Sequence, residues 1–120
     1  MKLVRYGAAG AEKPGVLDAQ GKIRDTSGLV PDITGEVLDP ESLDRLKKRD
    51  LSSLPVVPGT PRLGPCVGKV SKLICIGLNY SDHAAETGSP IPKEPILFQK
   101  AVSCIVGPND DIMLPQGSTK

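Results

Sequence analysis

The stretch CIGLNYSDHAAETG, residues 75–88, contains the only histidine of this 120-residue chain, His83, with Asp82 before it and Glu86 three residues after it. The apolar residues 73–76 lead into this stretch and predict a buried strand that ends at Gly77. A lone histidine is thus expected where a strand gives way to a helical turn.

The residues after the strand, SDHAAETG, predict one or two helical turns with Ser81 as the cap and Gly88 as the stop. On these turns His83 and Glu86 are three residues apart and lie on one face. A carboxylate that accepts one imidazole N–H fixes the tautomer and leaves the other ring nitrogen free as a base. The alternative is a surface or packing histidine, because the pattern HxxE is weak when it stands alone.

The residues that follow predict further β structure. SPIPKEP, residues 89–95, reads as a rigid loop, and GPNDD, residues 107–111, reads as a turn. Short strands are predicted at three places, namely 96–100 (ILFQK), 103–106 (SCIV) and 112–115 (IMLP).

The N-terminal half predicts a small β unit with one helix. KLVRY, residues 2–6, is a strand, and residues 15–25 form a hairpin with Gly21 at a position that needs positive φ. Asp39 is a suitable N-cap and Pro40 suits the first position of a helix over residues 40–49. The proline-rich residues 54–65 exclude a helix or a central strand and predict a linker or an extended arm.

Composition excludes several classes of function. The net charge is +1 without a basic block, which argues against a nucleic-acid partner. No apolar run approaches the roughly 20 residues that cross a bilayer, and no signal peptide is recognisable, so we expect no membrane contact and a cytoplasmic location. Three scattered cysteines favour reduced thiols over a disulfide framework or a zinc site. Glycine and proline, 13 and 12 residues, predict short strands and many loops.

Two motifs at the expected separation resemble the fumarylacetoacetate hydrolase family. They are G-x-N-Y-x-x-H-x-x-E at residues 77–86 and P-x-x-F-x-K at residues 95–100. The resemblance covers about residues 70–120, and the region before it resembles the variable leader domain of bacterial members. It implies a mainly β (α+β) fold: a small N-terminal β domain with one helix, then the first part of a β-sandwich-like roll. The expected domains are a leader with a proline-rich linker, 1–65, and the start of the catalytic domain, 66–120.

The resemblance also assigns roles to residues of both motifs. It implies that His83 and Glu86 form the catalytic dyad that activates water. It implies that a second group of residues lines the substrate site. It also implies that Gly77 and Asn79 shape the turn that positions the histidine. The expected substrate-binding residues are Asn79, Phe98, Gln99 and Lys100.

Members of the family bind Mg²⁺ or Mn²⁺ through three carboxylates that include a Glu-x-Glu pair. No Glu-x-Glu occurs in this chain, so no metal ligand is assigned and the ligands are expected beyond Lys120. Asp110 and Asp111 are adjacent and would point to opposite sides of a strand, so we interpret them as turn residues. The sequence therefore looks like the first half of an enzyme.

The resemblance implies a metal-dependent hydrolase that cleaves a C–C bond in a small 2,4-dioxo acid, of the acylpyruvate or fumarylacetoacetate kind, and that forms a homodimer. Three alternatives stay open: a ureidoglycolate lyase; a decarboxylase, isomerase or hydratase of the same family; and, if the chain is complete, a non-enzymatic β-rich interaction module. The substrate side chain and the preferred metal are not encoded in these residues.

Overall fold

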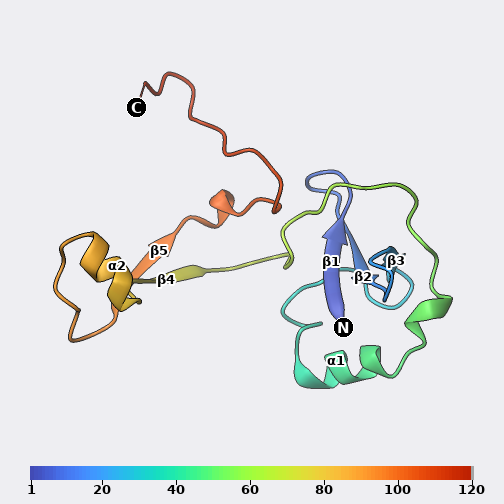
Figure 1. Cartoon of the computed structure of the whole chain (residues 1–120). Helices are drawn as coiled ribbons and strands as arrows, with labels where there is room; N and C mark the ends of the chain where they lie inside the picture. The colour runs from blue at the N-terminus through green and yellow to red at the C-terminus, as the bar shows by residue number, and fades with distance from the viewer. Residues whose placement is uncertain (120) are drawn as a thin grey trace. The chain divides into compact units, whose positions relative to one another are not determined.

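The computed structural model describes residues 1–119, and it divides into two compact units. Unit 1 consists of Met1–Lys69 with Ile105–Lys120, and unit 2 consists of Val70–Cys104. Both units are built on small antiparallel sheets with short helices, so the predicted mainly β class is confirmed (Figure 1). The two units do not test the domains expected from the sequence. The division into a leader with its linker, residues 1–65, and the start of a catalytic domain, residues 66–120, stays a prediction.

Three antiparallel strands form the sheet of unit 1, in the order β1-β2-β3. They are β1 (Lys2–Tyr6), β2 (Lys13–Leu17) and β3 (Ile23–Asp25). β2 is the central strand, with Val4 opposite Gly15 and Val16 opposite Arg24. Gly21 has a φ of +76° in the turn between β2 and β3, as the hairpin prediction required. The predicted strand and hairpin are therefore confirmed.

The core of unit 1 lies beneath this sheet and is small. Its fully covered side chains come from β2, from the turn after β3 and from the segment before α1. They are Pro14, Val16, Thr26 and Ile33, with Tyr6 and Leu46 at 7% and 5% exposure beside them. Burial of the Tyr6 phenol raises its pKa to about 12, and Asp25 adds to this.

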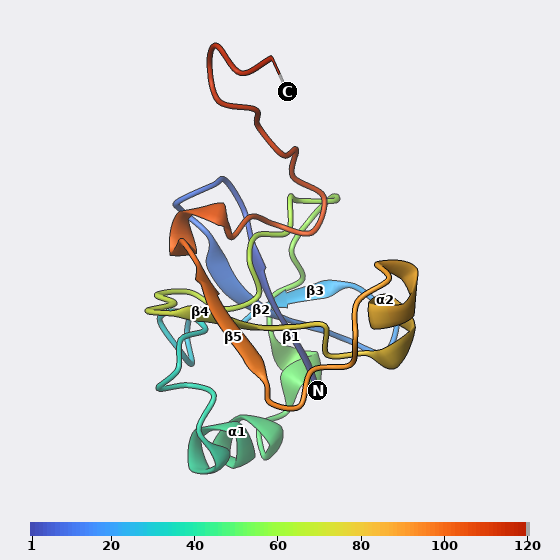
Figure 2. The same ribbon diagram turned by 90° about the vertical axis from the view of Figure 1, so that its left-hand side faces the viewer.

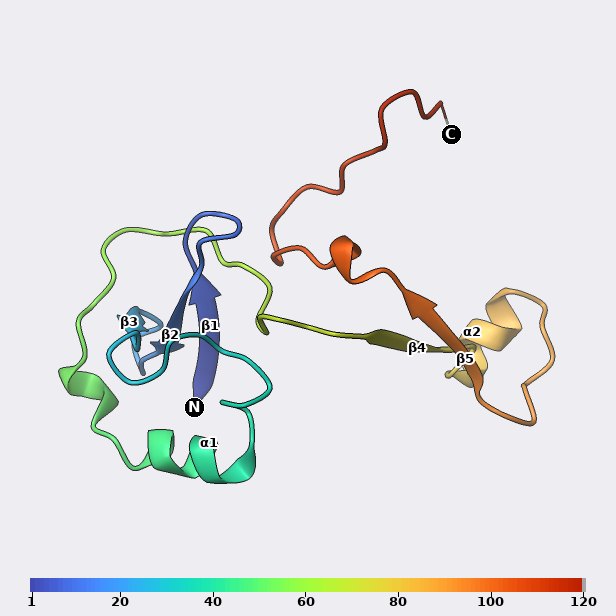
Figure 3. The same cartoon turned by 180° about the vertical axis from the view of Figure 1, so that it is seen from behind.

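The proline-rich segment borders both edges of the sheet. At the β1 edge the Gly7 N–H donates to the carbonyl of Arg62 at 2.9 Å, and the N–H of Gly64 donates to Arg5 O at 2.8 Å. At the β3 edge the Asp25 N–H donates to Pro55 O at 2.9 Å. The extended arm is therefore confirmed, and it occupies the edges that would otherwise offer unpaired backbone groups to other chains (Figure 3).

Helix α1 (Pro40–Lys47) forms where the capping residues predicted it. The Asp39 carboxylate accepts hydrogen bonds from the N–H groups of Glu41 and Ser42, at 3.0 and 3.1 Å. Leu46 is the buried residue of the helix, and a short 3₁₀ turn, Leu51–Ser53, follows it. In each ribbon view α1 lies beside the start of β1 (Figure 2).

Unit 2 contains β4 (Leu73–Gly77), α2 (Ser81–Glu86) and β5 (Ile96–Lys100), followed by a 3₁₀ turn, Val102–Cys104. The strand predicted at 103–106 is wrong, because the Cys104 N–H donates to Ala101 O and closes that turn. The strand predicted at 112–115 is also wrong. Within residues 1–119 that segment has no ladder partner, and Ile112, Met113 and Leu114 are 90%, 87% and 73% exposed.

Candidate functional site

Strand β4 brings the chain to the histidine. Its apolar residues pair with β5 in an antiparallel ribbon, where they alternate between half-buried and exposed. Ile74 and Ile76 are 61% and 42% exposed, so the prediction of a buried strand is wrong within the described chain. A two-stranded ribbon has two faces, and in unit 2 only one face of β4 is partly covered.

The turn after β4 depends on an unusual backbone conformation at Leu78, whose φ is +45°. A bulky residue in the left-handed region costs about 1–3 kcal/mol, which the surrounding structure must offset. The sequence pointed to Gly77 and Asn79 as the shaping residues, but the left-handed position falls between them. Leucine carries no sequence signal for positive φ, so this feature could not be predicted.

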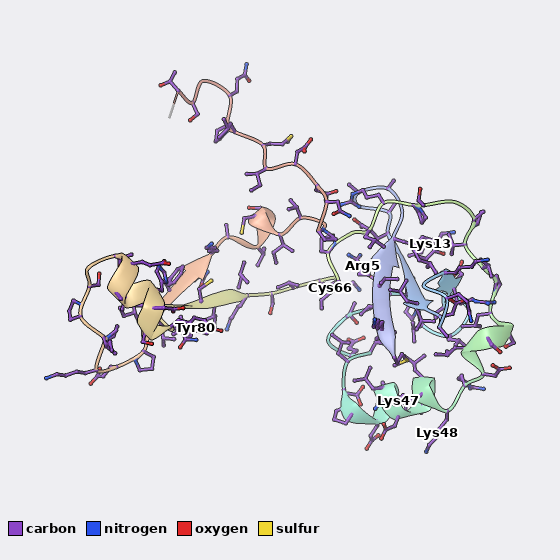
Figure 4. All side chains as sticks on the ribbon, viewed as in Figure 1. Arg5, Lys13, Lys47, Lys48, Cys66 and Tyr80 are labelled. Atoms are coloured by element: carbon purple, nitrogen blue, oxygen red, sulfur yellow. The ribbon has the colours of Figure 1, made fainter. Side chains whose placement is uncertain are left out.

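Helix α2 carries the predicted dyad. Its N-cap is Tyr80, whose side chain makes no capping hydrogen bond, and Ser81 is the first helical residue, so the cap predicted at Ser81 is wrong. Gly88 has a φ of +63° and ends the helix as predicted. Figure 4 labels Tyr80 near the junction of β4 and α2.

Ala84 orients α2, because its side chain is 1% exposed whereas His83 and Glu86 are exposed. The i, i+3 spacing places His83 and Glu86 on one helical face. Within residues 1–119 no hydrogen bond joins the imidazole to the carboxylate. The Asp82 carboxylate accepts from the backbone N–H of His83 at 2.8 Å, at the start of the helix. The dyad thus has the spacing for its role and stays a prediction.

Strand β5 presents the second motif, and its register with β4 sorts the predicted substrate residues. Phe98 pairs with Cys75, Lys100 with Leu73 and Gln99 with Ile74. Directly opposite residues of an antiparallel pair share a face, and successive residues alternate. Phe98 and Lys100 therefore share a face with Cys75, while Gln99 lies on the other face.

The ribbon also separates the predicted residues along its length. Gly77 pairs with Ile96 at the end where α2 begins, and Lys100 pairs with Leu73 at the far end. Four residues of strand span about 13 Å. Lys100 and the dyad helix are thus attached to opposite ends of the ribbon.

Asn79 lies in a hollow of about 250 Å³ inside unit 2. The hollow is lined by the end of β4, by the turn that follows it and by the loop 91–95. Among its lining residues, Asn79 is the one expected to bind substrate, and Gly77, expected to shape the turn, lines it too. Cys75, opposite Phe98, was not singled out from the sequence, because its place beside Phe98 depends on the register of β4 with β5.

A metal site cannot be built from the described residues. Within residues 1–119 no group of three His, Cys, Asp or Glu side chains could hold an ion. Asp110 is engaged instead: its carboxylate accepts from the Gly107 N–H at 2.6 Å, which closes the predicted turn. None of the described helices is long and apolar enough to cross a membrane.

Comparison with known proteins matches the motif-bearing region to a family. Residues 72–120 match the family model described as "Fumarylacetoacetate (FAA) hydrolase C-terminal". The chain is 59% identical over 120 residues to a "Putative hydrolase" of Burkholderia ambifaria, and 59% and 60% identical to proteins of that description from Burkholderia multivorans and Burkholderia cenocepacia. It covers 100% of its own length in these matches and 43% of each relative.

A solved structure shares the fold. It is titled "Crystal structure of a putative HpcE protein from Mycobacterium smegmatis" and matches with a TM-score of 0.64 at 25% sequence identity. The match covers 98% of this chain and 42% of that one. The chain thus spans less than half the length of the proteins it resembles.

Proposed function

We propose that this chain, whose residues 72–120 match the fumarylacetoacetate hydrolase family model, is part of a hydrolase that cleaves a C–C bond in a small 2,4-dioxo acid. The observation that carries the proposal is the β4–α2–β5 arrangement. It displays the histidine and the glutamate of one motif on a single helical face, and the phenylalanine and lysine of the other on a single strand face.

The first chemical role falls to His83. Its ring nitrogen takes a proton from water, and Glu86 accepts the other imidazole N–H to hold the tautomer. The hydroxide attacks the distal carbonyl carbon of the substrate and a C–O bond forms. The C–C bond then breaks, and its electron pair leaves as the enolate of a 2-oxo acid. Protonated His83 returns the proton to that enolate.

The residues on one face of β5 contribute substrate binding and a positive charge. The Lys100 ammonium attracts the substrate carboxylate, at the end of the substrate away from the attacked carbonyl, because Lys100 and α2 are attached to opposite ends of the ribbon. Phe98 forms an apolar wall, and Asn79 offers an amide at the turn. Gln99 needs a different arrangement to reach the same substrate, because it lies on the opposite face of β5.

The divalent cation that the family resemblance implies has no ligand set among residues 1–119. The described part of this chain therefore does not fit the ion, and no step above depends on it. We also propose that the enzyme acts as a cytoplasmic homodimer, for which gel filtration of the native protein is the test.

The test begins with the intact mass of the native protein, which defines the species assayed. That protein is then incubated with a panel of acylpyruvates in Mg²⁺ and Mn²⁺ buffers, and release of the 2-oxo acid is followed. His83→Ala should lower kcat by about 100- to 10,000-fold, as loss of a general base does. Asp82→Asn is the matched control, because that side chain only caps a backbone N–H, and it should retain activity.

Two results would contradict the hydrolase proposal. One is release of urea from ureidoglycolate with no cleavage of any acylpyruvate, which favours the lyase. The other is full activity of His83→Ala, which removes the dyad from the chemistry.

A further inference from the structure

Two arginines of unit 1 each grip one carboxylate with two nitrogens. Arg5 on β1 donates from Nε and Nη2 to Asp32, at 2.7 and 3.1 Å. Arg62 in the extended arm donates from Nε to Asp110 at 2.7 Å, and its Nη2 contacts the second oxygen. Such bidentate pairs fix geometry as well as charge. They link segments that are far apart in the sequence.

Glu12 joins the two pairs into one network. Its Oε1 accepts from Arg62 Nη1 at 2.9 Å, and its Oε2 lies 3.6 Å from Arg5 Nη2. The Glu12 side chain is only 6% exposed and that of Arg5 11%. Two guanidinium groups held this close would repel each other, and the single carboxylate between them offsets that repulsion.

The network sits where the chain leaves unit 1 and where it returns. The chain leaves after Lys69, and just before this point Arg5 Nη1 donates to Pro65 O at 3.3 Å. The Gly68 N–H donates to Ile33 O at 2.7 Å, beside Asp32. Figure 4 labels Arg5 and Cys66 in this region.

The return point is held in the same way. The chain re-enters unit 1 at Ile105, and the Gly107 N–H donates to Asp110, the carboxylate that Arg62 grips. Between the two points lies all of unit 2, with the predicted dyad and substrate residues. Fixing both ends of so long a loop costs entropy, which the contacts at those ends must offset.

The carboxylates of the network pack directly against the backbone at three glycines. A Cβ on Gly64 would lie 2.6 Å from Glu12 Cγ, and one on Gly68 would lie 2.5 Å from Asp32 Oδ2. A Cβ on Gly107 would collide with Leu63 O and would lie 2.9 Å from Asp110 Oδ2. Each carboxylate of the network thus packs on a glycine where no side chain fits.

We propose that Glu12 is a positioning residue that couples the two arginine-centred anchors and so restrains both ends of segment 70–104. The proposal rests on contacts inside unit 1 and is independent of the reaction proposed above. The charge state supports it: hydrogen bonding from Arg62, against the effect of burial, lowers the pKa of Glu12. Glu12 is therefore ionised at neutral pH, as a bridge between two cations requires.

The test is amide hydrogen exchange, measured residue by residue on the native protein and on Glu12→Gln, which keeps the shape and removes the charge. The Gly68 and Gly107 amides should both exchange at least tenfold faster, while the amides of α1 stay unchanged. Asp18→Asn is the matched control. It breaks the comparably buried pair with Arg24 in the same unit and should leave both glycine amides protected.

Asp110→Asn adds a one-ended comparison, because it should release Gly107 far more than Gly68. The proposal is overturned if Glu12→Gln loosens only one end, or if Asp18→Asn accelerates the two glycine amides equally. If Glu12→Gln does not fold, Glu12→Asp keeps the charge with a shorter reach. It must then still accelerate both amides, by less than tenfold, and unchanged exchange would reject the coupling.

Discussion

Both units contain a small antiparallel sheet, yet they differ in what covers it. In unit 1 the extended arm borders both sheet edges, and Val16 and Ile33 are each 1% exposed. In unit 2 each strand has a single neighbour, and Ile74 and Leu97 are 61% and 67% exposed. Within residues 1–119 all six ion pairs also belong to unit 1.

The difference shows that apolar composition and burial are separate properties of a strand. β4 reads LICIG, a continuous apolar run of the kind found in strands covered on both faces. The strands of unit 1 are no more apolar, but the same unit provides their cover. We therefore expect unit 1 to hold most of the stability within the described chain, since a lone two-stranded hairpin is marginal in water.

Truncation of one isoleucine in each unit tests this difference between the two units most directly. Ile33→Ala removes a fully buried side chain and should cost about 2–5 kcal/mol of unfolding free energy. Ile76→Ala removes one that is 42% exposed and should cost less than about 1 kcal/mol. Urea titration of both variants measures the difference. Equal losses of unfolding free energy would mean that the core of unit 2 contributes as much stability as the core of unit 1.

A second comparison uses one strand glycine from each sheet. A Cβ on Gly15, in central strand β2, would lie 2.8 Å from a methyl of Ile23 and 3.1 Å from Arg24 O. Gly15→Ala should therefore destabilise the protein by about 1–3 kcal/mol. A Cβ on Gly77 would lie 3.3 Å from a side-chain methyl of Ile96 and at an ordinary 3.7 Å from the Ile96 carbonyl oxygen, so a small shift of that side chain accommodates it. Thermal unfolding of Gly77→Ala should stay close to that of the parent, and a larger drop than for Gly15→Ala would reverse the ranking.

Local chemistry made much of the fold predictable. Gly21 and the Asp39–Pro40 pair each determine a turn or a helix start from a few adjacent residues, and the structure places both features as predicted. The strands expected at 103–106 and 112–115 failed because a strand needs a partner, and its partner is not encoded in its own residues. The cap expected at Ser81 failed by one position, which is within the usual uncertainty of helix ends.

The candidate site was predictable to the level of its elements. Motif spacing placed a strand, a short helix and a second strand where the structure has β4, α2 and β5. Strict alternation along β5 could already have separated Gln99 from Phe98 and Lys100, because neighbours on a strand face opposite ways. The pairing of Phe98 with Cys75 depends on register, and the left-handed Leu78 depends on its surroundings, so neither could be derived from the sequence.

The third comparison of the two units is the loss of stability at acidic pH, which should affect unit 1 more than unit 2. Hydrogen bonding from Arg62 lowers the pKa of both Glu12 and Asp110. Burial alone would raise the pKa of Asp32, but hydrogen bonds from Arg5 and from the Ile33 N–H outweigh burial, so the pKa of Asp32 is lowered as well. Groups with a lowered folded pKa contribute stability that is present above their unfolded values, 4.5 for Glu12 and 3.8 for the aspartates, and lost as pH falls below them.

The measurement is exchange of unit 1 and unit 2 amides between pH 6 and pH 3, corrected for the intrinsic pH dependence of exchange. Protection should fall in unit 1 as the pH drops below about 4.5, and Glu12→Gln should flatten the curve. A unit 1 whose protection is constant down to pH 3 would show that these ion pairs contribute no net stability.

The smallest expected effect compares the two helix starts. Asp39→Ala removes a side chain that accepts from two backbone N–H groups of α1, so that helix should fray at its first turn. Ser81→Ala removes no capping bond, because the N-cap of α2 is Tyr80 and its side chain caps nothing. Amide exchange at Ser42 should therefore accelerate in the first variant, while Ala84 in the second should stay unchanged. Faster exchange at Ala84 would mean that the Ser81 hydroxyl supports α2 after all. The contrast between α1, whose N-cap side chain accepts hydrogen bonds, and α2, whose N-cap side chain accepts none, would then carry no energetic weight.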